Sequence, residues 1–163
     1  MTVTRHGAGL AQLVVTACWL GAALLLAAAV APAAFAALPS RSLAGDVVGR
    51  VLPVVFWSGM VTFAAVTVCG VWTDAASKYK PRVLAAAIGG TACMIAQFIV
   101  DAMIARVRAQ AHGPVDALAA TDPLRVAFGQ LHVFSVVLLG VAILAAVAVL
   151  VLAARGQRAL SQN

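Results

Sequence analysis

The sequence predicts an all-α integral membrane protein, a four-helix bundle with a short amphipathic helix between its first and second spans. Only 10% of its 163 residues are charged and its mean hydropathy is +1.05, which excludes the water-soluble globular class. Four stretches hold no Asp, Glu, Lys or Arg: residues 6–40, 51–73, 83–100 and 126–154. A spanning helix needs about 20 apolar residues, so all four stretches reach or approach the length that crosses a bilayer.

We expect one domain, residues 1–163, because four spans with short connections use nearly the whole chain. The predicted spans are residues 8–31, 52–73, 82–105 and 124–154. The first span imitates a secretory signal, with the small residues Ala34 to Ala36 in the place of a cleavage site. Its apolar run exceeds the core of about 7–15 residues that signals use, so we expect it to be retained.

Proline and capping residues set the predicted ends of the first two spans. The first helix is expected to end near Pro32. Ser40 then offers an N-cap for a short amphipathic helix that continues to about Val51. Pro53 lacks an amide proton and therefore suits the first turn of the second span.

The third span is expected to begin near Pro81 and to emerge from the membrane as a helical extension carrying Arg106 and Arg108. Gly113-Pro114 ends this helix. The fourth span opens at Thr121-Asp122-Pro123, which is typical of an N-cap followed by proline at the first helical position.

Small residues at helical spacing let helices pack closely in lipid. Two glycine pairs are the candidate packing positions: Gly45 with Gly49 in a GxxxG spacing, and Gly89 with Gly90 in the third span.

The net charge of +6 lies at the ends of the spans, where basic residues set topology and meet lipid headgroups. We therefore expect a lipid bilayer as the partner and no nucleic acid. An even number of spans puts both termini on one side with the turn 74–82, and that side holds six of the eleven basic residues. The positive-inside rule thus predicts a multi-pass protein of the cell inner (cytoplasmic) membrane with both termini cytoplasmic.

Two segments resemble a known family. They are the run from Val30 to Arg41, with Leu52, Pro53 and Phe56 after it, and the segment Phe128 to Ser135, which contains a Phe-x-x-x-His-x-x-Ser pattern. Together they are similar to the transmembrane-protein-205-like family, a bacterial membrane domain of unknown function of the DUF4149 type. The family pattern implies a first span ending in Phe-x-x-Leu-Pro, a short amphipathic helix and a second span opening at Leu-Pro.

Many family members carry an Asn and a Pro-Arg near the end of the third span, where this chain has Gln97, Asp101 and Arg106. An animal relative is associated with tolerance of platinum drugs, and the bundle is distantly similar to copper-resistance-D-type membrane proteins. These resemblances imply handling of metals or small cations.

Ionisable side chains within a span are candidates for function because burying them is costly. Asp101 and His132 both lie near the non-cytoplasmic end of their spans, and antiparallel neighbours would bring them together. The predicted polar cluster is Gln97, Asp101, His132, Ser135 and Trp57. In the alternative interpretation, Asp101 pairs with Arg108 or a headgroup amine and His132 bonds a neighbouring helix.

Metal ligation has three weak candidates, Cys18, Cys93 and His132. No cofactor is predicted. Haem through His132 and a soft-metal site, such as copper, on Cys18 and Cys93 stay open as alternatives. His132 is the one intramembrane histidine, which excludes a bis-histidine haem within one chain.

No P-loop, GxGxxG, HExxH or nucleophile-elbow motif is present, so we do not expect an enzyme. Two function classes fit. The first, which we favour, is a non-catalytic accessory subunit of a larger membrane complex, and it predicts helix surfaces that contact other membrane-protein subunits. The second, a transport or tolerance protein for metal or small cations, predicts a polar cavity that reaches Asp101 and His132.

Overall fold

The structure, a computed structural model, describes residues 2–73 and 80–161, and every regular element in these ranges is a helix. Four helical segments are long and apolar enough to cross a membrane: residues 9–37, 41–70, 81–111 and 123–155. The predicted all-α membrane bundle with four spans is confirmed.

The first span is a continuous rod that runs past its predicted end. It consists of α1 (Thr2–Leu25), the π-helical turn η1 (Leu26–Val30) and α2 (Ala31–Ala37). The Ala31 N–H donates to the Leu26 carbonyl, five residues back. This wider turn comes just before Pro32, whose missing N–H would otherwise leave a gap in the regular hydrogen-bond ladder, so the helix continues to Ala37.

The second span, α3 (Arg41–Thr73), absorbs the short helix that the sequence predicts as a separate element. Its N-cap is as predicted, because the Leu43 N–H donates to Ser40 Oγ over 3.2 Å. Pro53 lies inside the helix without ending it. In lipid a break would expose several backbone groups, whereas a proline removes one hydrogen bond, so one unbroken helix is the favoured arrangement.

The third span also contains a π-helical segment. It is built from α4 (Lys80–Met94), η3 (Ile95–Val100) and α5 (Asp101–Ala111). His112 ends it with φ at 51°, a left-handed cap. A short 3-10 turn, η4 (Val115–Ala117), leads towards the fourth span.

The fourth span is α6 (Pro123–Ser161), the longest helix described. Asp122 caps it, since its Oδ1 accepts the Leu124 N–H over 2.8 Å. The predicted N-cap followed by proline is therefore confirmed. The basic turn that the sequence uses for orientation falls largely on residues 74–79, outside the described residues.

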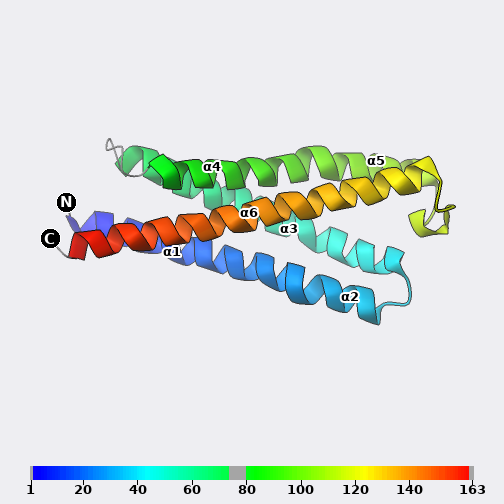
Figure 1. The fold of residues 1–163 in the computed structure, drawn as a ribbon, viewed down its shortest axis with the longest axis horizontal. Helices are drawn as coiled ribbons and strands as arrows, with labels where there is room; N and C mark the ends of the chain where they lie inside the picture. Colours follow the sequence, from blue (N-terminus) through cyan, green and yellow to red (C-terminus); the bar gives the residue numbers. More distant parts are fainter. Residues whose placement is uncertain (1, 74–79, 162–163) are drawn as a thin grey trace.

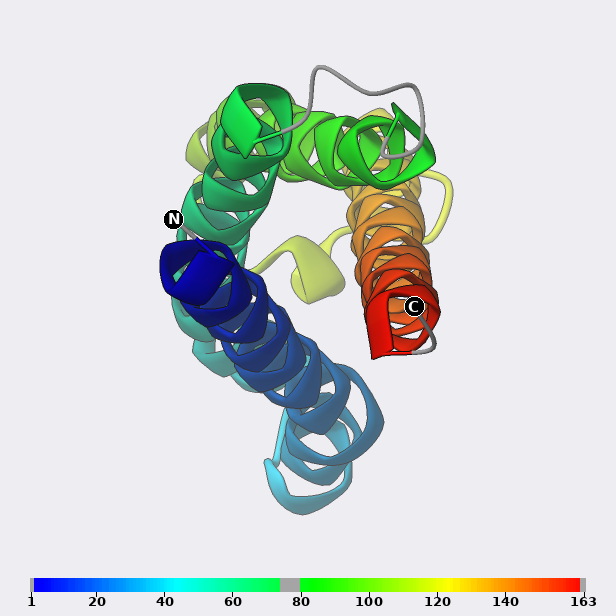
Figure 2. The same ribbon diagram turned by 90° about the vertical axis from the view of Figure 1, so that its left-hand side faces the viewer.

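The helices run antiparallel, with both chain ends at one end of the bundle and the α2–α3 and α5–α6 connections at the other (Figure 1). Viewed end-on, the order around the bundle is α1, α3, α4 and α6 (Figure 2), and each neighbouring pair is in contact. The η4 turn lies between the helices in this view and at the connection end in Figure 1.

The core is packed most tightly where α3 crosses α4. Phe63 is 1% exposed and meets Trp19 edge-on, with 5.1 Å between ring centroids. A Cβ on Gly89 would lie 2.5 Å from the Phe63 ring, and one on Gly59 would lie 2.8 Å from Cys93 Sγ. Both glycines are therefore needed for the close approach of α3 and α4.

A candidate ligand cavity at the connection end of the bundle

A cavity of about 750 Å³ opens at the connection end of the bundle. Its walls are the first half of α3, the η3–α5 segment and the start of α6, with Phe35 of α2 and the connector 113–116 at its rim. A shallower hollow of about 470 Å³ adjoins it and shares Arg41 and Phe128. The volume of the main cavity lies in the range that holds small organic ligands, about 300–1,000 Å³.

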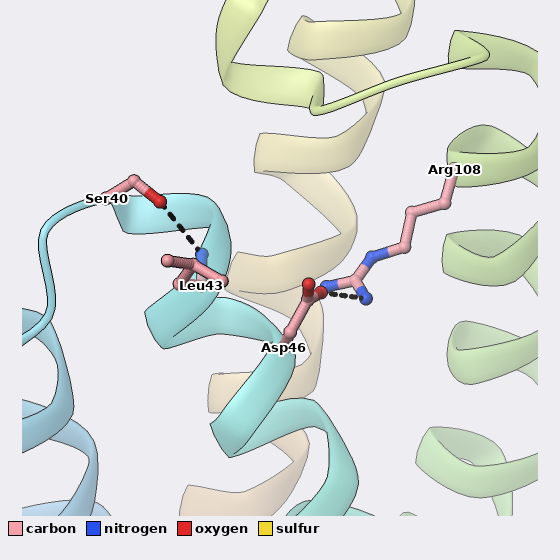
Figure 3. Close-up of polar contacts among 4 residues, drawn as sticks. All are labelled: Ser40, Leu43, Asp46 and Arg108. Carbon is pink, nitrogen blue, oxygen red and sulfur yellow. Dashed lines mark hydrogen bonds and ion pairs between the residues drawn. The ribbon is translucent and has the colours of Figure 1, made fainter.

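An ion pair crosses the mouth of this cavity. Arg108 Nη1 of α5 lies 2.7 Å from Asp46 Oδ1 of α3 (Figure 3). The guanidinium carbon also lies 5.4 Å from the centre of the Phe128 ring of α6. Arg108 therefore contacts two different helices, and the charge of Asp46 is neutralised.

The two glycines of the GxxxG spacing, Gly45 and Gly49, lie beside the Arg108 side chain. A Cβ on Gly45 or Gly49 would lie 3.8 or 3.9 Å from Arg108 Nη2. The structure thus places these two glycines beside a guanidinium, and among the described residues no backbone atom of another helix lies within 4 Å of either Cβ position. Gly89 and Gly90 differ, because both would bring a Cβ within 3.3 Å or less of Phe63, as expected of helix-packing positions.

Four of the five residues of the predicted polar cluster line the cavity: Gln97, Asp101, His132 and Ser135. Gln97 Nε2 donates to Asp101 Oδ2 over 3.4 Å, a long hydrogen bond. The Gln97 Oε1 atom is buried and has no hydrogen-bond partner among the described residues. Ser135 is 5% exposed, so the polar groups continue to the inner end of the cavity.

The π-helical segment η3 determines where Gln97 and Asp101 lie. The Asp101 N–H donates to the Ala96 carbonyl, five residues back, instead of to Gln97. The wider turn changes the angular spacing of the side chains around the helix. Gln97 is half-buried and Asp101 exposed, and both nevertheless line the same cavity.

The alternative pairing of Asp101 with Arg108 is wrong. Arg108 forms its ion pair with Asp46 instead. Arg108 comes seven residues after Asp101 in α5 and lies nearer the connection end of the bundle. Among the described residues, Asp101 has the Gln97 amide as its hydrogen-bond partner and forms no ion pair.

Trp57 does not join the cavity. Its side chain is 51% exposed and meets Phe98 edge-on, with 5.4 Å between the ring centroids. The neighbouring residue Phe56 is 2% exposed and lines the cavity. One position along an α-helix turns the side chain by about 100°, so Trp57 faces the outside of the bundle although its depth is suitable.

The three candidate metal ligands lie in different places. Cys18 is exposed, Cys93 is buried against Gly59, and His132 lines the cavity. In the described ranges no three His, Cys, Asp or Glu side chains lie close enough to hold a metal ion. A copper ion bound by any of them would therefore need further donors.

Sequence reasoning missed the Asp46–Arg108 pair. A usable signal exists in the antiparallel register of α3 and α4, in which Gly59 faces Cys93 and Phe63 faces Gly89. Continued along both helices, this register brings Asp46 opposite Arg108. The sequence alone does not show which glycines lie where α3 crosses α4, so it does not determine the register of the two helices.

Comparison with known proteins identifies the family. No curated protein and no solved structure matches the chain, and the more distant resemblances to transmembrane-protein-205-like and copper-resistance-D-type proteins receive no separate support. The sequence profile of a domain of unknown function, DUF4149, matches residues 14–113. This range includes Gln97 and Asp101 and ends before α6, which carries His132 and Ser135. The chain belongs to the DUF4149 family of membrane domains.

Proposed function

We propose that this protein binds a small cation in the cavity at the connection end, as part of transport of, or tolerance to, such cations. The observation that carries the proposal is the Asp101 carboxylate, which lies within a span, lines the cavity and has no ion-pair partner among the described residues. An unpaired charge at this depth is costly, and a bound cation would offset that cost.

The charges around the cavity also favour a positively charged ligand. Its lining carries three carboxylates, Asp46, Asp101 and Asp116, against two guanidinium groups, Arg41 and Arg108. With Asp46 and Arg108 paired, Asp101 is the carboxylate that lies deepest and is left for a ligand. The aromatic ring of Phe56 in the lining can also face a cation, whereas that of Phe128 already faces the Arg108 guanidinium.

The bundle core is well packed at Phe63, which is 1% exposed and lies edge-on to Trp19, and neither residue lines the cavity. We propose that a ligand enters at the connection end, which suits a binding protein or one half of an alternating path. We place that side away from the cytoplasm, following the distribution of basic residues. No catalytic step is part of the proposal.

The test is equilibrium binding by calorimetry to the full chain in lipid nanodiscs, with empty nanodiscs as the blank. The probes are phenethylammonium, phenethyltrimethylammonium and the uncharged 2-phenylethanol. We expect at least one of the cations to bind and the alcohol not to bind. Asp101→Asn should weaken cation binding roughly 10- to 100-fold, as expected for loss of a charge-assisted interaction.

Asp122→Asn is the matched control, since it removes the same charge outside the cavity and asparagine also caps helices. Its affinity should equal that of the wild type. Absence of binding by both cations, or equal weakening by both substitutions, would overturn the proposal.

The accessory role that the sequence favours stays an alternative proposal, and the same preparation separates the two. An accessory subunit would bind neither cation and would co-purify with a fixed partner in mild detergent. The cavity favours the cation-binding role because a packing subunit has no need of an unpaired carboxylate within a span.

A further inference from the structure

We infer that the ligand is an organic cation that donates hydrogen bonds, namely a primary ammonium carrying an apolar group. This inference rests on the proposed cation-binding role and specifies its substrate class. It follows from the hydrogen-bonding capacity of the groups at the inner end of the cavity. Charge alone would not distinguish a primary from a quaternary ammonium.

The inner groups are mainly acceptors. Asp101 can only accept when ionised, and the NH2 group of Gln97 is already directed to Asp101. The Gln97 Oε1 atom is an acceptor without a donor. Ser135 and a neutral imidazole at His132 can each donate or accept. The groups left with acceptor capacity alone are therefore Asp101 and Gln97 Oε1, and a ligand is recognised here by the N–H groups that it brings.

The Gln97–Asp101 contact is also easy to replace. At 3.4 Å it is longer than the usual 2.9–3.0 Å of N–H···O bonds. An ammonium that takes the place of Nε2 on Asp101 would form a shorter, charge-assisted bond. The released amide can then rotate, so that its buried Oε1 accepts a second N–H from the same ammonium.

The rest of the lining fits the apolar part of such a ligand. Leu52, Phe56, Ala96 and Phe128 line the same cavity as the polar groups, and its volume of about 750 Å³ exceeds the volume that a bare ammonium would fill. A quaternary ammonium has the same charge and similar apolar contacts but no N–H. It therefore isolates the hydrogen-bonding part of the inference.

The experiment compares phenethylammonium with phenethyltrimethylammonium on the wild type, Gln97→Leu and Gln110→Leu in nanodiscs. Gln110 is the matched control because it is exposed near the end of α5 and does not line the cavity. We expect the wild type to prefer the primary ammonium roughly tenfold, the effect of one or two charge-assisted hydrogen bonds. Gln97→Leu should remove most of this preference, whereas Gln110→Leu should retain it.

The two proposals fail differently. If both cations bind equally, Asp101→Asn weakens both and Gln97→Leu weakens neither, then the inference is overturned and the cation-binding role survives. If neither cation binds the wild type, the proposed function fails and the inference fails with it. Should Gln97→Leu lower the folded yield, Gln97→Glu gives a second reading. It keeps an acceptor, so it should retain the preference for the primary over the quaternary ammonium, and loss of that preference would overturn the inference.

Discussion

Replacing Gly89 by alanine tests whether α3 and α4 pack as closely as the structure shows. The new Cβ would lie 2.5, 2.7 and 2.8 Å from three atoms of the Phe63 ring, whereas carbon atoms pack best at about 3.5–4.0 Å. The ring would have to move by about 1 Å. It has little room, since it is 1% exposed and lies edge-on to Trp19.

The expected loss follows from two opposing terms. Overpacking of a buried site costs about 1–3 kcal/mol, and three simultaneous clashes favour the upper half of that range. Alanine recovers up to about 1 kcal/mol through its better helix propensity. We therefore expect the free energy of unfolding to fall by about 1–2 kcal/mol. The assay is SDS-induced unfolding in mixed micelles, followed by far-UV circular dichroism.

Gly21→Ala is the matched control, because a Cβ there has no neighbour within 4 Å. Its stability should equal or slightly exceed that of the wild type. Combining Gly89→Ala with Phe63→Leu should show a favourable coupling of about 1 kcal/mol or more, since the smaller side chain relieves the clash. If Gly89→Ala is as stable as Gly21→Ala, the close crossing of α3 and α4 is refuted.

Three further predictions follow from the fold and the cavity. On a cysteine-free background, a single cysteine at position 116 should react with an impermeant reagent outside the cell and one at position 78 should not; the reverse pattern would contradict the proposed orientation. Arg108→Gln and Asp46→Asn should each lower the free energy of unfolding by about 1 kcal/mol or less, because the paired side chains are 38% and 49% exposed; their double substitution should lose less than the sum, and strict additivity would count against the pair. Trp57→Leu should leave phenethylammonium affinity unchanged, since the indole faces the outside of the bundle, and a loss of binding would return this residue to the cavity.

The sequence predicts the spans well because a bilayer imposes a strict requirement on length and polarity. All four charge-free stretches became helices of spanning length. The caps at Ser40 and Asp122 were also predictable, since side-chain acceptors at helix starts act locally. Helix boundaries at proline were less predictable. The chain continues through Pro32 and Pro53 because in lipid an unbroken helix satisfies more backbone groups.

The site depends on angular position around each helix, which span prediction does not provide. Asp101 and His132 share a cavity because α5 and α6 meet antiparallel at the right depth. Trp57 has a suitable depth but the wrong face. Gln97 lies in a π-helical segment that no sequence pattern here predicts, and this segment alters the spacing between Gln97 and Asp101. The Asp46–Arg108 pair required the register of α3 against α4, which is fixed by packing at Gly59 and Gly89.

Photolabelling with 4-azidophenethylammonium tests the central claim, that a cation occupies this cavity beside Asp101, most directly. After irradiation of the wild type in nanodiscs, peptide mass spectrometry should find the label on cavity-lining residues within 96–104 and 128–135. Excess phenethylammonium should suppress this labelling, 2-phenylethanol should not, and Asp101→Asn should reduce it in line with the weaker binding. Labelling that concentrates on the outward faces of the helices, or that persists unchanged in Asp101→Asn, would contradict the account.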